Sequence, residues 1–244
     1  MKGYDAASYG DNIADVYDAL YGDVDTRPAI DALTALAAMG PILELGIGTG
    51  RLALPLVQRG LRVDGIDASQ EMVKSLRRKP GGDQLTVSMG DFTDFDLDKT
   101  YALIFVAFNT LFNLRSQAEQ VSCFEAVSRH LTSDGAFVVE AFVPDVGRFS
   151  RNQRINASEI AIDKVIIDVT HHDPVAQEVA SQHILITEQG IRLLPVLARY
   201  AYPSELDLMA RLAGLQLDER WADWDGSPFS SGSEKHVSVY RPGG

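Results

Sequence analysis

A glycine-rich turn at residues 46–50 constrains this chain more than any other feature of its sequence. The turn follows an apolar run, Ile42–Leu45, and precedes the helix-like segment Leu52–Gln58. Glycines let the backbone approach a ligand closely because no Cβ intervenes, and the start of a helix offers unpaired N–H groups. The pattern therefore predicts a buried strand that leads through a ligand-binding turn into a helix.

The spacing of the glycines separates two classes of ligand. A dinucleotide fingerprint requires Gly-x-Gly-x-x-Gly. Here Gly46 and Gly48 are followed by Gly50 one residue early, and Arg51 stands where the third glycine would be. Glu44, two residues before the turn, would repel a pyrophosphate and suits a cationic amino-acid group instead. An NAD-dependent oxidoreductase is therefore disfavoured.

Acidic residues follow two further apolar runs. Asp67 ends the run Leu61–Ile66, where its carboxylate can accept hydrogen bonds from both hydroxyls of a ribose, whether the ligand is an adenosyl compound or NAD. Gly90-Asp91-Phe92 follows Leu85–Met89, where a carboxylate can accept from the amino group of adenine and a backbone N–H can donate to a ring nitrogen. Together with the turn, these acids describe one adenosyl ligand with a positively charged tail.

Short apolar runs alternate with helical patterns between residues 41 and 142. The predicted strands are Pro41–Leu45, Leu61–Ile66, Leu85–Met89, Tyr101–Ala107 and Gly135–Phe142. Ser69 can cap a helix at Glu71–Lys79, and Ser116 opens another helix with a capping box. This alternation predicts a doubly wound α/β fold, in which helices cover both faces of a mostly parallel sheet.

The pattern changes after residue 142. Three strand-like stretches separated by turn-prone dipeptides indicate an antiparallel meander: Ile160–Val169, Val179–Thr187 and Ile191–Tyr202. Helical periodicity returns at Ser204–Ala213, and Leu215–Trp221 and His236–Tyr240 are predicted closing strands. We therefore expect one domain at 1–142 and 203–244, with an antiparallel β insertion at 143–202 before the last helix.

The β insertion carries apolar side chains on both faces of its predicted strands. Val165 and Ile167 lie on one face, for example, and Ile162 and Ile166 lie on the other. One face must pack on the domain, and the other either roofs the substrate as a lid or forms a homodimer. The sequence leaves these two uses open.

The motifs Glu44–Gly50, Asp67 and Gly90-Asp91-Phe92 resemble motifs I, II and III of the class I S-adenosylmethionine-dependent methyltransferases. The resemblance covers about residues 15–142 and 203–241. It implies a Rossmann-like, seven-stranded sheet with an antiparallel last strand, S-adenosyl-L-methionine as cofactor and S-adenosyl-L-homocysteine as product. The glycines would cradle the methionine portion, and the other implied contacts are Glu44, Asp67, Ala68, Met72, Asp91, Phe92, Ala107 and Phe108.

A narrower resemblance concerns the segment Asp15–Tyr21 and the meander before the last helix. This layout is similar to that of actinobacterial natural-product methyltransferases, which include the aminosugar N,N-dimethyltransferases. On a helix Tyr17 and Tyr21 share a face, so both rings can close over a sulfonium. Tyr21 is then a cofactor contact and Tyr17 a candidate catalytic residue, and a simple core contact is the alternative. The resemblance rests on layout, so it does not identify the substrate.

Further candidate catalytic residues follow from the geometry of methyl transfer, in which positioning the nucleophile supplies much of the acceleration. Asn109 or Asn113, after the fourth strand, can orient a methyl acceptor. His183, in the insertion, either faces a pocket or packs; facing a pocket, it would be a base for an amine or hydroxyl. No metal site is expected, because the adjacent residues of His171-His172-Asp173 point to opposite faces of a strand.

Composition limits the partners. A formal net charge of -12 repels nucleic acid and anionic lipid, so neither is expected to bind, and a small neutral or cationic substrate fits better. The single cysteine, Cys123, excludes an intrachain disulfide, and no apolar run approaches the roughly 20 residues of a membrane-spanning helix. With no signal-peptide core near residue 1, we expect a cytoplasmic protein.

These observations lead to two functional hypotheses. The first is S-adenosylmethionine-dependent transfer of a methyl group to N or O of a small molecule, in specialised metabolism. The alternative is a protein that binds the same cofactor in the same fold but carries out non-methylating, cyclase-like chemistry or has a regulatory role. The complete set of cofactor residues favours the first.

Overall fold

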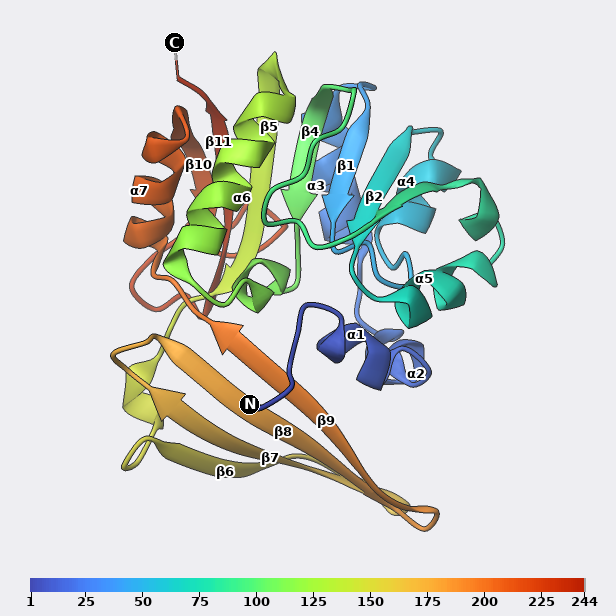
Figure 1. The fold of residues 1–244 in the computed structure, drawn as a ribbon, viewed down its shortest axis with the longest axis vertical. Helices are drawn as coiled ribbons and strands as arrows, with labels where there is room; N and C mark the ends of the chain where they lie inside the picture. The colour runs from blue at the N-terminus through green and yellow to red at the C-terminus, as the bar shows by residue number, and fades with distance from the viewer. Residues whose placement is uncertain (244) are drawn as a thin grey trace.

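A seven-stranded sheet forms the larger part of the computed structural model, which describes residues 1–243 (Figure 1). The strand order is β10-β11-β5-β4-β1-β2-β3, and β11 runs antiparallel to both its neighbours while the other pairs are parallel. The strands are β1 (Ile42–Leu45), β2 (Val63–Asp67), β3 (Thr86–Met89), β4 (Tyr101–Val106), β5 (Leu131–Phe142), β10 (Leu215–Trp221) and β11 (Lys235–Pro242). The predicted fold class is confirmed.

Helices cover both faces of this sheet. They are α3 (Arg27–Ala37), α4 (Ala53–Gln58), α5 (Gln70–Arg77), α6 (Gln117–His130) and α7 (Pro203–Leu212), with short 3-10 turns η1 (Gly82–Gln84), η2 (Thr110–Asn113) and η3 (Val146–Arg148). Side chains of α6 and α7 pack with one face of the strands, and those of α3 and α4 pack with the other. Ser69 and Ser116 cap α5 and α6 as predicted, because each side chain accepts a backbone N–H of the first turn.

A second sheet lies beyond the carboxyl ends of the first (Figure 1). It is an antiparallel meander of four strands: β6 (Gln153–Ile160), β7 (Lys164–Asp173), β8 (Glu178–Thr187) and β9 (Gly190–Arg199). The prediction of three strands was wrong. β6 is an edge strand with largely polar side chains, so it lacks the apolar run by which the other three were found. The sheet falls within the predicted insertion 143–202, and that domain division stays a prediction.

The two faces of the second sheet differ in chemistry. Residues that are directly opposite on antiparallel strands share a face. Asp168, His183 and Leu194 are in register across β7, β8 and β9, and Leu194 is buried against Ile13 and Ala14 near the N-terminus. We call this side the inner face, and the opposite side, which carries Ile167, Ile184 and Leu193, the outer face.

Two short helices, α1 (Ser8–Ile13) and α2 (Tyr17–Tyr21), lie between the sheets (Figure 1). Three carboxylates hold this segment. Asp11 accepts a hydrogen bond from Ser69 at the start of α5 (2.6 Å), Asp18 accepts from Thr49 in the glycine turn (2.7 Å), and Asp15 forms an ion pair with Arg192 of β9 (2.5 Å). The N-terminal helices are therefore tied both to the first sheet and to the second. No helix among residues 1–243 is long and apolar enough to cross a membrane.

A buried polar cluster fixes the second sheet to the helices of the first. The guanidinium of Arg199, at the end of β9, donates to Gln120 of α6 (2.5 Å) and to Glu205 of α7 (2.7 Å). Gln120 in turn donates to the backbone carbonyl of Arg199 (2.8 Å). Both Arg199 and Gln120 are buried, so their polar groups depend on each other rather than on water.

Substituting Arg199→Met should lower the free energy of unfolding by about 3 kcal/mol, because it leaves Glu205 and Gln120 without their buried partner. Urea unfolding followed by circular dichroism measures the change. The control is Arg211→Met on α7, where the arginine is exposed, and it should change stability by less than about 0.5 kcal/mol. Equal losses in the two variants would contradict a structural role for the cluster.

Candidate cofactor and substrate site

The carboxyl ends of β1, β2 and β4 meet at one edge of the first sheet. β1 pairs in parallel with β2 on one side and with β4 on the other. At the end of β1, the backbone N–H groups of Gly46 and Ile47 both donate to the carbonyl of Ile66 on β2 (2.8 and 3.0 Å). This edge is where open α/β sheets bind ligands, and it faces α1, α2 and the second sheet (Figure 1).

The three glycines of the turn have different physical roles. All three adopt positive φ, at 74° for Gly46, 56° for Gly48 and 80° for Gly50. A Cβ on Gly46 would meet Thr110 at 2.5 Å, and one on Gly50 would meet Leu76 at 2.4 Å. A Cβ on Gly48 would meet only a backbone oxygen at 3.9 Å. Close packing therefore requires two of the glycines, and at the third the backbone is open to a ligand.

Glu44 carries a buried carboxylate, one oxygen of which lacks a hydrogen-bond partner among the described residues. Its side chain is 6% exposed, and its Oε2 atom has no hydrogen-bond partner among residues 1–243. Burial raises the pKa of Glu44 well above its usual range, and the charge of Arg51 opposes this rise. An orphaned buried carboxylate is costly unless a donor or a cation meets it. The residue therefore fits the ammonium group of S-adenosylmethionine, as the sequence predicts.

Asp67 organises the turn from the end of β2. Its Oδ2 atom accepts the backbone N–H of Gly48 (2.7 Å), and its Oδ1 atom accepts that of Ser69 (2.8 Å). Burial raises the pKa of Asp67, and these two hydrogen bonds lower it. Each oxygen keeps a second lone pair, so the carboxylate can still accept from two ribose hydroxyls.

The predicted adenine contacts lie in two different environments. Met72 is buried on α5 and packs with Ile13 of α1, and the neighbouring Ala68 is half-buried. Asp91 is exposed beyond β3 and accepts the backbone N–H of Thr93 (2.9 Å). The ring of Phe92 lies in the core cluster under the sheet, which leaves its backbone as the part available to a ligand. Their roles in binding adenine stay predictions.

The end of β4 is held in an unusual backbone conformation. Phe108 and Asn109, which follow Ala107, have φ values of 57° and 65°, in the left-handed region that costs energy for residues other than glycine. Glu140 of β5 stabilises this turn because its carboxylate accepts the Phe108 N–H (2.8 Å). The side-chain oxygen of Asn109 accepts the N–H of Phe142 (2.7 Å), so its NH₂ group and the second lone pair of this oxygen are left to orient an acceptor.

An aromatic box stands above this turn. The rings of Tyr17 and Tyr21 are 4.9 Å apart, as their shared helix face predicts, and Tyr21 meets Phe108 edge-on at 5.2 Å. The guanidinium of Arg51 lies 4.4 Å from the centre of the Phe108 ring, and its buried Nε has no hydrogen-bond partner within the described chain. Burial raises the pKa of Tyr17, and nearby Arg51 opposes this rise. Arg51 therefore places a cation against one ring of this aromatic cluster.

His183, the predicted base, lies on the inner face of the second sheet, where it pairs with Asp168. Burial raises the pKa of Tyr21, and the nearby charge of Asp168 adds to that rise. The pair is therefore close to the aromatic box. In the part of the chain that the structure describes, no three His, Cys, Asp or Glu side chains group closely enough to hold a metal ion.

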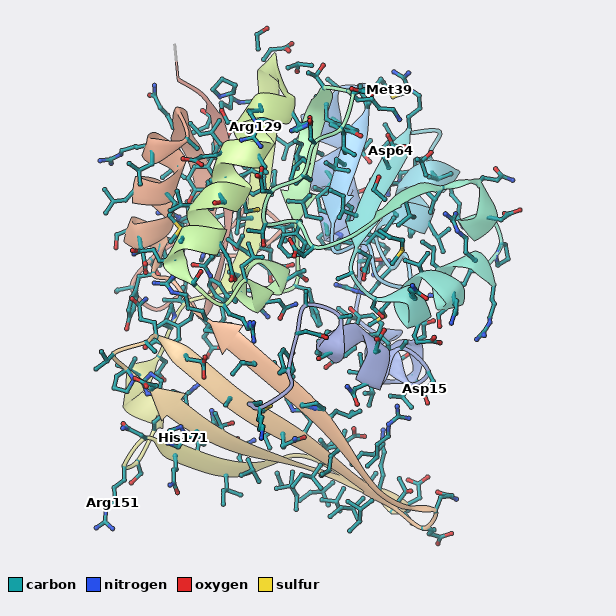
Figure 2. All side chains as sticks on the ribbon, in the orientation of Figure 1. Asp15, Met39, Asp64, Arg129, Arg151 and His171 are labelled. Atoms are coloured by element: carbon teal, nitrogen blue, oxygen red, sulfur yellow. The ribbon has the colours of Figure 1, made fainter. Side chains whose placement is uncertain are left out.

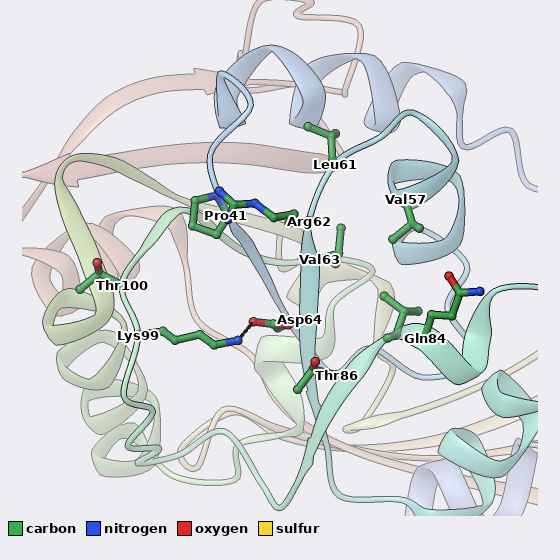
Figure 3. Close-up of a pocket in the computed structure, with 11 residues that line it drawn as sticks. Pro41, Val57, Leu61, Arg62, Val63, Asp64, Gln84, Thr86, Lys99 and Thr100 are labelled. Carbon is green, nitrogen blue, oxygen red and sulfur yellow. Dashed lines mark hydrogen bonds and ion pairs between the residues drawn. The ribbon is translucent and has the colours of Figure 1, made fainter.

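Two cavities border the first sheet at opposite ends. A cavity of about 540 Å³ lies at the amino ends of β1, β2 and β3, where Asp64 pairs with Lys99 (2.7 Å; Figure 3). Asp64 lies far from the second sheet, whereas Asp15 lies beside α1 and α2 (Figure 2). The other cavity, of about 300 Å³, is lined by Arg51, Phe108 and Glu140 and adjoins the aromatic box. Of these two cavities the second belongs to the predicted site, and a further cavity of about 530 Å³ shares Phe108 and Glu140 with it.

Sequence reasoning assigned no role to Arg51, Glu140 or Asp168. Arg51 was visible beside the glycine turn, but its place in an aromatic box depends on α2, which packs over the turn only in the folded chain. Glu140 lies inside an apolar run, where an acid has no distinguishing signal. Asp168 is one of several acids in the insertion, and only the register of β7 with β8 selects it.

This chain is similar to known methyltransferases. The family model described as "Methyltransferase domain" matches residues 42–135. The structure of the CcbJ methyltransferase from Streptomyces caelestis is similar with a TM-score of 0.93 and 43% identity, covering 99% of this chain and 100% of that one.

Two curated relatives are more distant in sequence. The cypemycin N-terminal methyltransferase from Streptomyces sp is 26% identical over 199 residues, which cover 81% of each chain. The dTDP-3-amino-3,6-dideoxy-alpha-D-glucopyranose N,N-dimethyltransferase from Streptomyces fradiae is 28% identical over 141 residues, 55% of this chain and 54% of that one. The predicted likeness to actinobacterial natural-product and aminosugar methyltransferases is confirmed.

Substituting Asp67→Asn should weaken S-adenosylhomocysteine binding at least about tenfold, because an amide cannot accept both backbone N–H groups and also both ribose hydroxyls. Isothermal titration calorimetry measures the affinity. The loss should be smaller for the 2′-deoxy analogue, which lacks one of those hydroxyls. Asp64→Asn on the same strand, at the opposite end of the sheet, should leave binding unchanged. Equal affinities of the Asp67 variant and the parent chain would remove Asp67 from the site.

Proposed function

Because the chain belongs to the family of S-adenosylmethionine-dependent methyltransferases, we propose that it transfers a methyl group to an amine nitrogen of a small specialised metabolite. S-adenosylmethionine, the predicted cofactor, is confirmed for this family and supplies the methyl group when it is bound. The chemistry of the methyl acceptor is inferred from the side chains around the site.

The aromatic box carries the proposal of an amine acceptor. Tyr17, Tyr21 and Phe108 form a cluster of rings at the end of β4, and the Arg51 guanidinium lies over the Phe108 ring. The faces of aromatic rings stabilise cations by about 0.5–2 kcal/mol. The ring faces that Arg51 does not cover can stabilise an ammonium substrate in this way, and the net charge of -12 favours cationic ligands at long range.

The names of two relatives agree with this assignment. One is an N-terminal methyltransferase acting on cypemycin, and the other is an N,N-dimethyltransferase of an amino sugar. Both acceptors are amines, although one belongs to a peptide and the other to a sugar nucleotide. The proposal therefore extends to the nitrogen atom and not to a particular scaffold.

The chain's own groups account for binding and for exclusion of water. Glu44 would hold the cofactor's ammonium group, Asp67 its ribose and the open backbone at Gly48 its methionine portion. The N-terminal helices lie over this edge and keep water from it, held by Asp11 and Asp18. Positioning of this kind supplies much of the rate of a displacement between two bound reactants.

A panel of acceptors tests the proposed function. The protein should release S-adenosylhomocysteine with at least one amine among trialanine, dTDP-3-amino-3,6-dideoxy-α-D-glucose and piperidine, because only these offer a nitrogen lone pair beside the aromatic box. Phenol, catechol and benzoate serve as oxygen acceptors, and Asp67→Asn is the control that lacks the cofactor site. Mass spectrometry identifies the methylated product.

Turnover of the oxygen acceptors alone would refute an amine substrate. Consumption of an acceptor without release of S-adenosylhomocysteine would favour the non-methylating, cyclase-like alternative. Binding of the cofactor with no conversion of any acceptor would favour a regulatory role.

We also propose that the outer face of the second sheet pairs with a second copy of the chain. Ile155 is 73% exposed, Ile191 71% and Leu193 54%, although all three are apolar. The central outer positions of the four strands carry uncharged side chains, of which Gln182 is the polar one: Ile155, Ala157, Val165, Ile167, Val169, Gln182, Ile184, Ile186, Ile191, Leu193 and Pro195. A largely apolar patch of this kind marks an interaction surface, and a self-complementary face suits a two-fold dimer.

We propose, as expected from the sequence, that the protein is cytoplasmic and binds neither nucleic acid nor membranes. This proposal rests on the acidic charge and on the single, buried cysteine. A small-molecule substrate is consistent with the family.

The double substitution Ile155→Glu and Leu193→Glu should convert a dimer into a monomer, because it would bring four like charges into the shared apolar surface. Sedimentation velocity measures the mass in solution. The control is Leu212→Glu, at an exposed position of α7, which should leave the dimer intact. A monomeric parent chain, or a variant that stays dimeric, would refute this interface.

A further inference from the structure

An aspartate and a histidine face each other across two strands of the second sheet. His183 of β8 is directly opposite Asp168 of β7, and its Nδ1 atom lies 2.5 Å from the Oδ1 atom of Asp168. An ionised carboxylate can only accept a hydrogen bond, so Nδ1 carries a proton, and in the neutral imidazole Nε2 then keeps a free lone pair. The same arrangement orients the histidine base in hydrolytic triads.

The pair of His183 and Asp168 faces the end of the first sheet and is only partly exposed to solvent. The side chain of His183 is 34% exposed and that of Asp168 is 20% exposed. Both lie on the inner face beside Leu194, which packs against α1. Asp168 is close enough to Tyr21 for its charge to add to the burial that raises the pKa of that phenol. His183 therefore lies on the face of the second sheet that is turned toward the aromatic box.

The other four histidines of the chain are not available for this role. His130 uses both ring nitrogens for backbone groups, and His172 is buried against a tyrosine hydroxyl. His236 is fully buried on β11, and burial lowers its pKa to about 4. His171 lies on the outer face, away from the site. His183 is thus the histidine that combines an anchored ring with an open nitrogen on the inner face.

We propose that His183 is the catalytic base that takes the proton from the substrate's ammonium group, and that Asp168 is the positioning residue that holds its ring. This step rests on the proposed function, since it is the ammonium form of an amine acceptor that must lose a proton before its nitrogen can attack. The N–H bond breaks and its proton moves to His183 Nε2, which leaves the electron pair on nitrogen. That pair forms the new N–C bond to the methyl group, while the electrons of the broken S–C bond remain on sulfur.

Titratable side chains from three further elements lie around the pair of His183 and Asp168. Arg154 of β6 is on the inner face, in register with Thr170, next to Asp168. Tyr21 approaches from α2, and Arg192 of β9, paired with Asp15, lies two residues from Leu194 on the same face. Asp168 is the group in direct contact with the imidazole, so its carboxylate should dominate the charge that a protonated His183 experiences.

Steady-state kinetics of matched variants as a function of pH test the inference. The substrate is the amine of the above panel that has the highest kcat/KM. His183→Gln should lower kcat about 100-fold at pH 7 with little change in KM. The loss should shrink as pH rises, because solvent then removes the ammonium proton. A purely structural role would give a loss that does not depend on pH.

The positioning role of Asp168 has its own readout. Asp168→Asn should lower kcat with little change in KM, because the imidazole ring loses the carboxylate that holds it in place. Asp168→Glu should restore part of the rate. Ser181→Ala, two residues from His183 on the same face, is the control for packing and should leave kcat unchanged. Affinity for S-adenosylhomocysteine should be equal in all of these variants.

Nitrogen-15 NMR of the substrate-free protein provides a measurement without turnover. His183 should show a protonated Nδ1 and an unprotonated Nε2, and Asp168→Asn should alter this tautomer balance. The reverse tautomer in the parent chain, or a His183→Gln variant with parental kcat at pH 7, would refute the inference alone. A parent chain that methylates no amine at any pH would refute the proposed function and, with it, this step.

Discussion

The parallel pairing of β1 with β2 and β4 is the constraint on which the rest of the molecule depends. Because all three strands run the same way and end at the same edge, the glycine turn, Asp67 and the turn at Phe108 are brought together although they are spread over some sixty residues of chain. The backbone hydrogen bonds from the turn to Ile66 then fix its distance from β2. The predicted cofactor contacts at the ends of β1, β2 and β4 are placed by this pairing.

A second layer of the site depends on polar contacts rather than on the sheet. Asp11, Asp15 and Asp18 are regularly spaced along the N-terminal segment, and they reach three separate partners on α5, β9 and the glycine turn. α1 and α2 are only six and five residues long, too short to be stable on their own. Their position therefore depends on these contacts and on the packing of Ile13 and its neighbours with Leu194. The aromatic box exists only when this segment is docked.

The sequence predicted strongly apolar or well-capped elements well and predicted polar ones poorly. The five strands before residue 142 and the helices begun by Ser69 and Ser116 lie where expected, because burial on both faces and capping leave local signals. β6 was missed because an edge strand needs no apolar run. The predicted cofactor residues gather at one edge, except that the ring of Phe92 lies in the core. The side-chain oxygen of Asn109 is engaged by the backbone, which a sequence pattern cannot reveal.

The sequence by itself determined the class of cofactor and the plan of the first sheet. Glycine spacing, a preceding acid and a carboxylate after each of the next two strands are local patterns whose chemistry does not depend on distant residues. Only the tertiary structure decided which side chains line the proposed acceptor site. Arg51 with Phe108, Glu140 with the turn after β4, and Asp168 with His183 join residues 15 to 57 positions apart, through strand register and helix docking. Such pairings arise from long-range packing, which leaves no periodic or spacing signal in the chain.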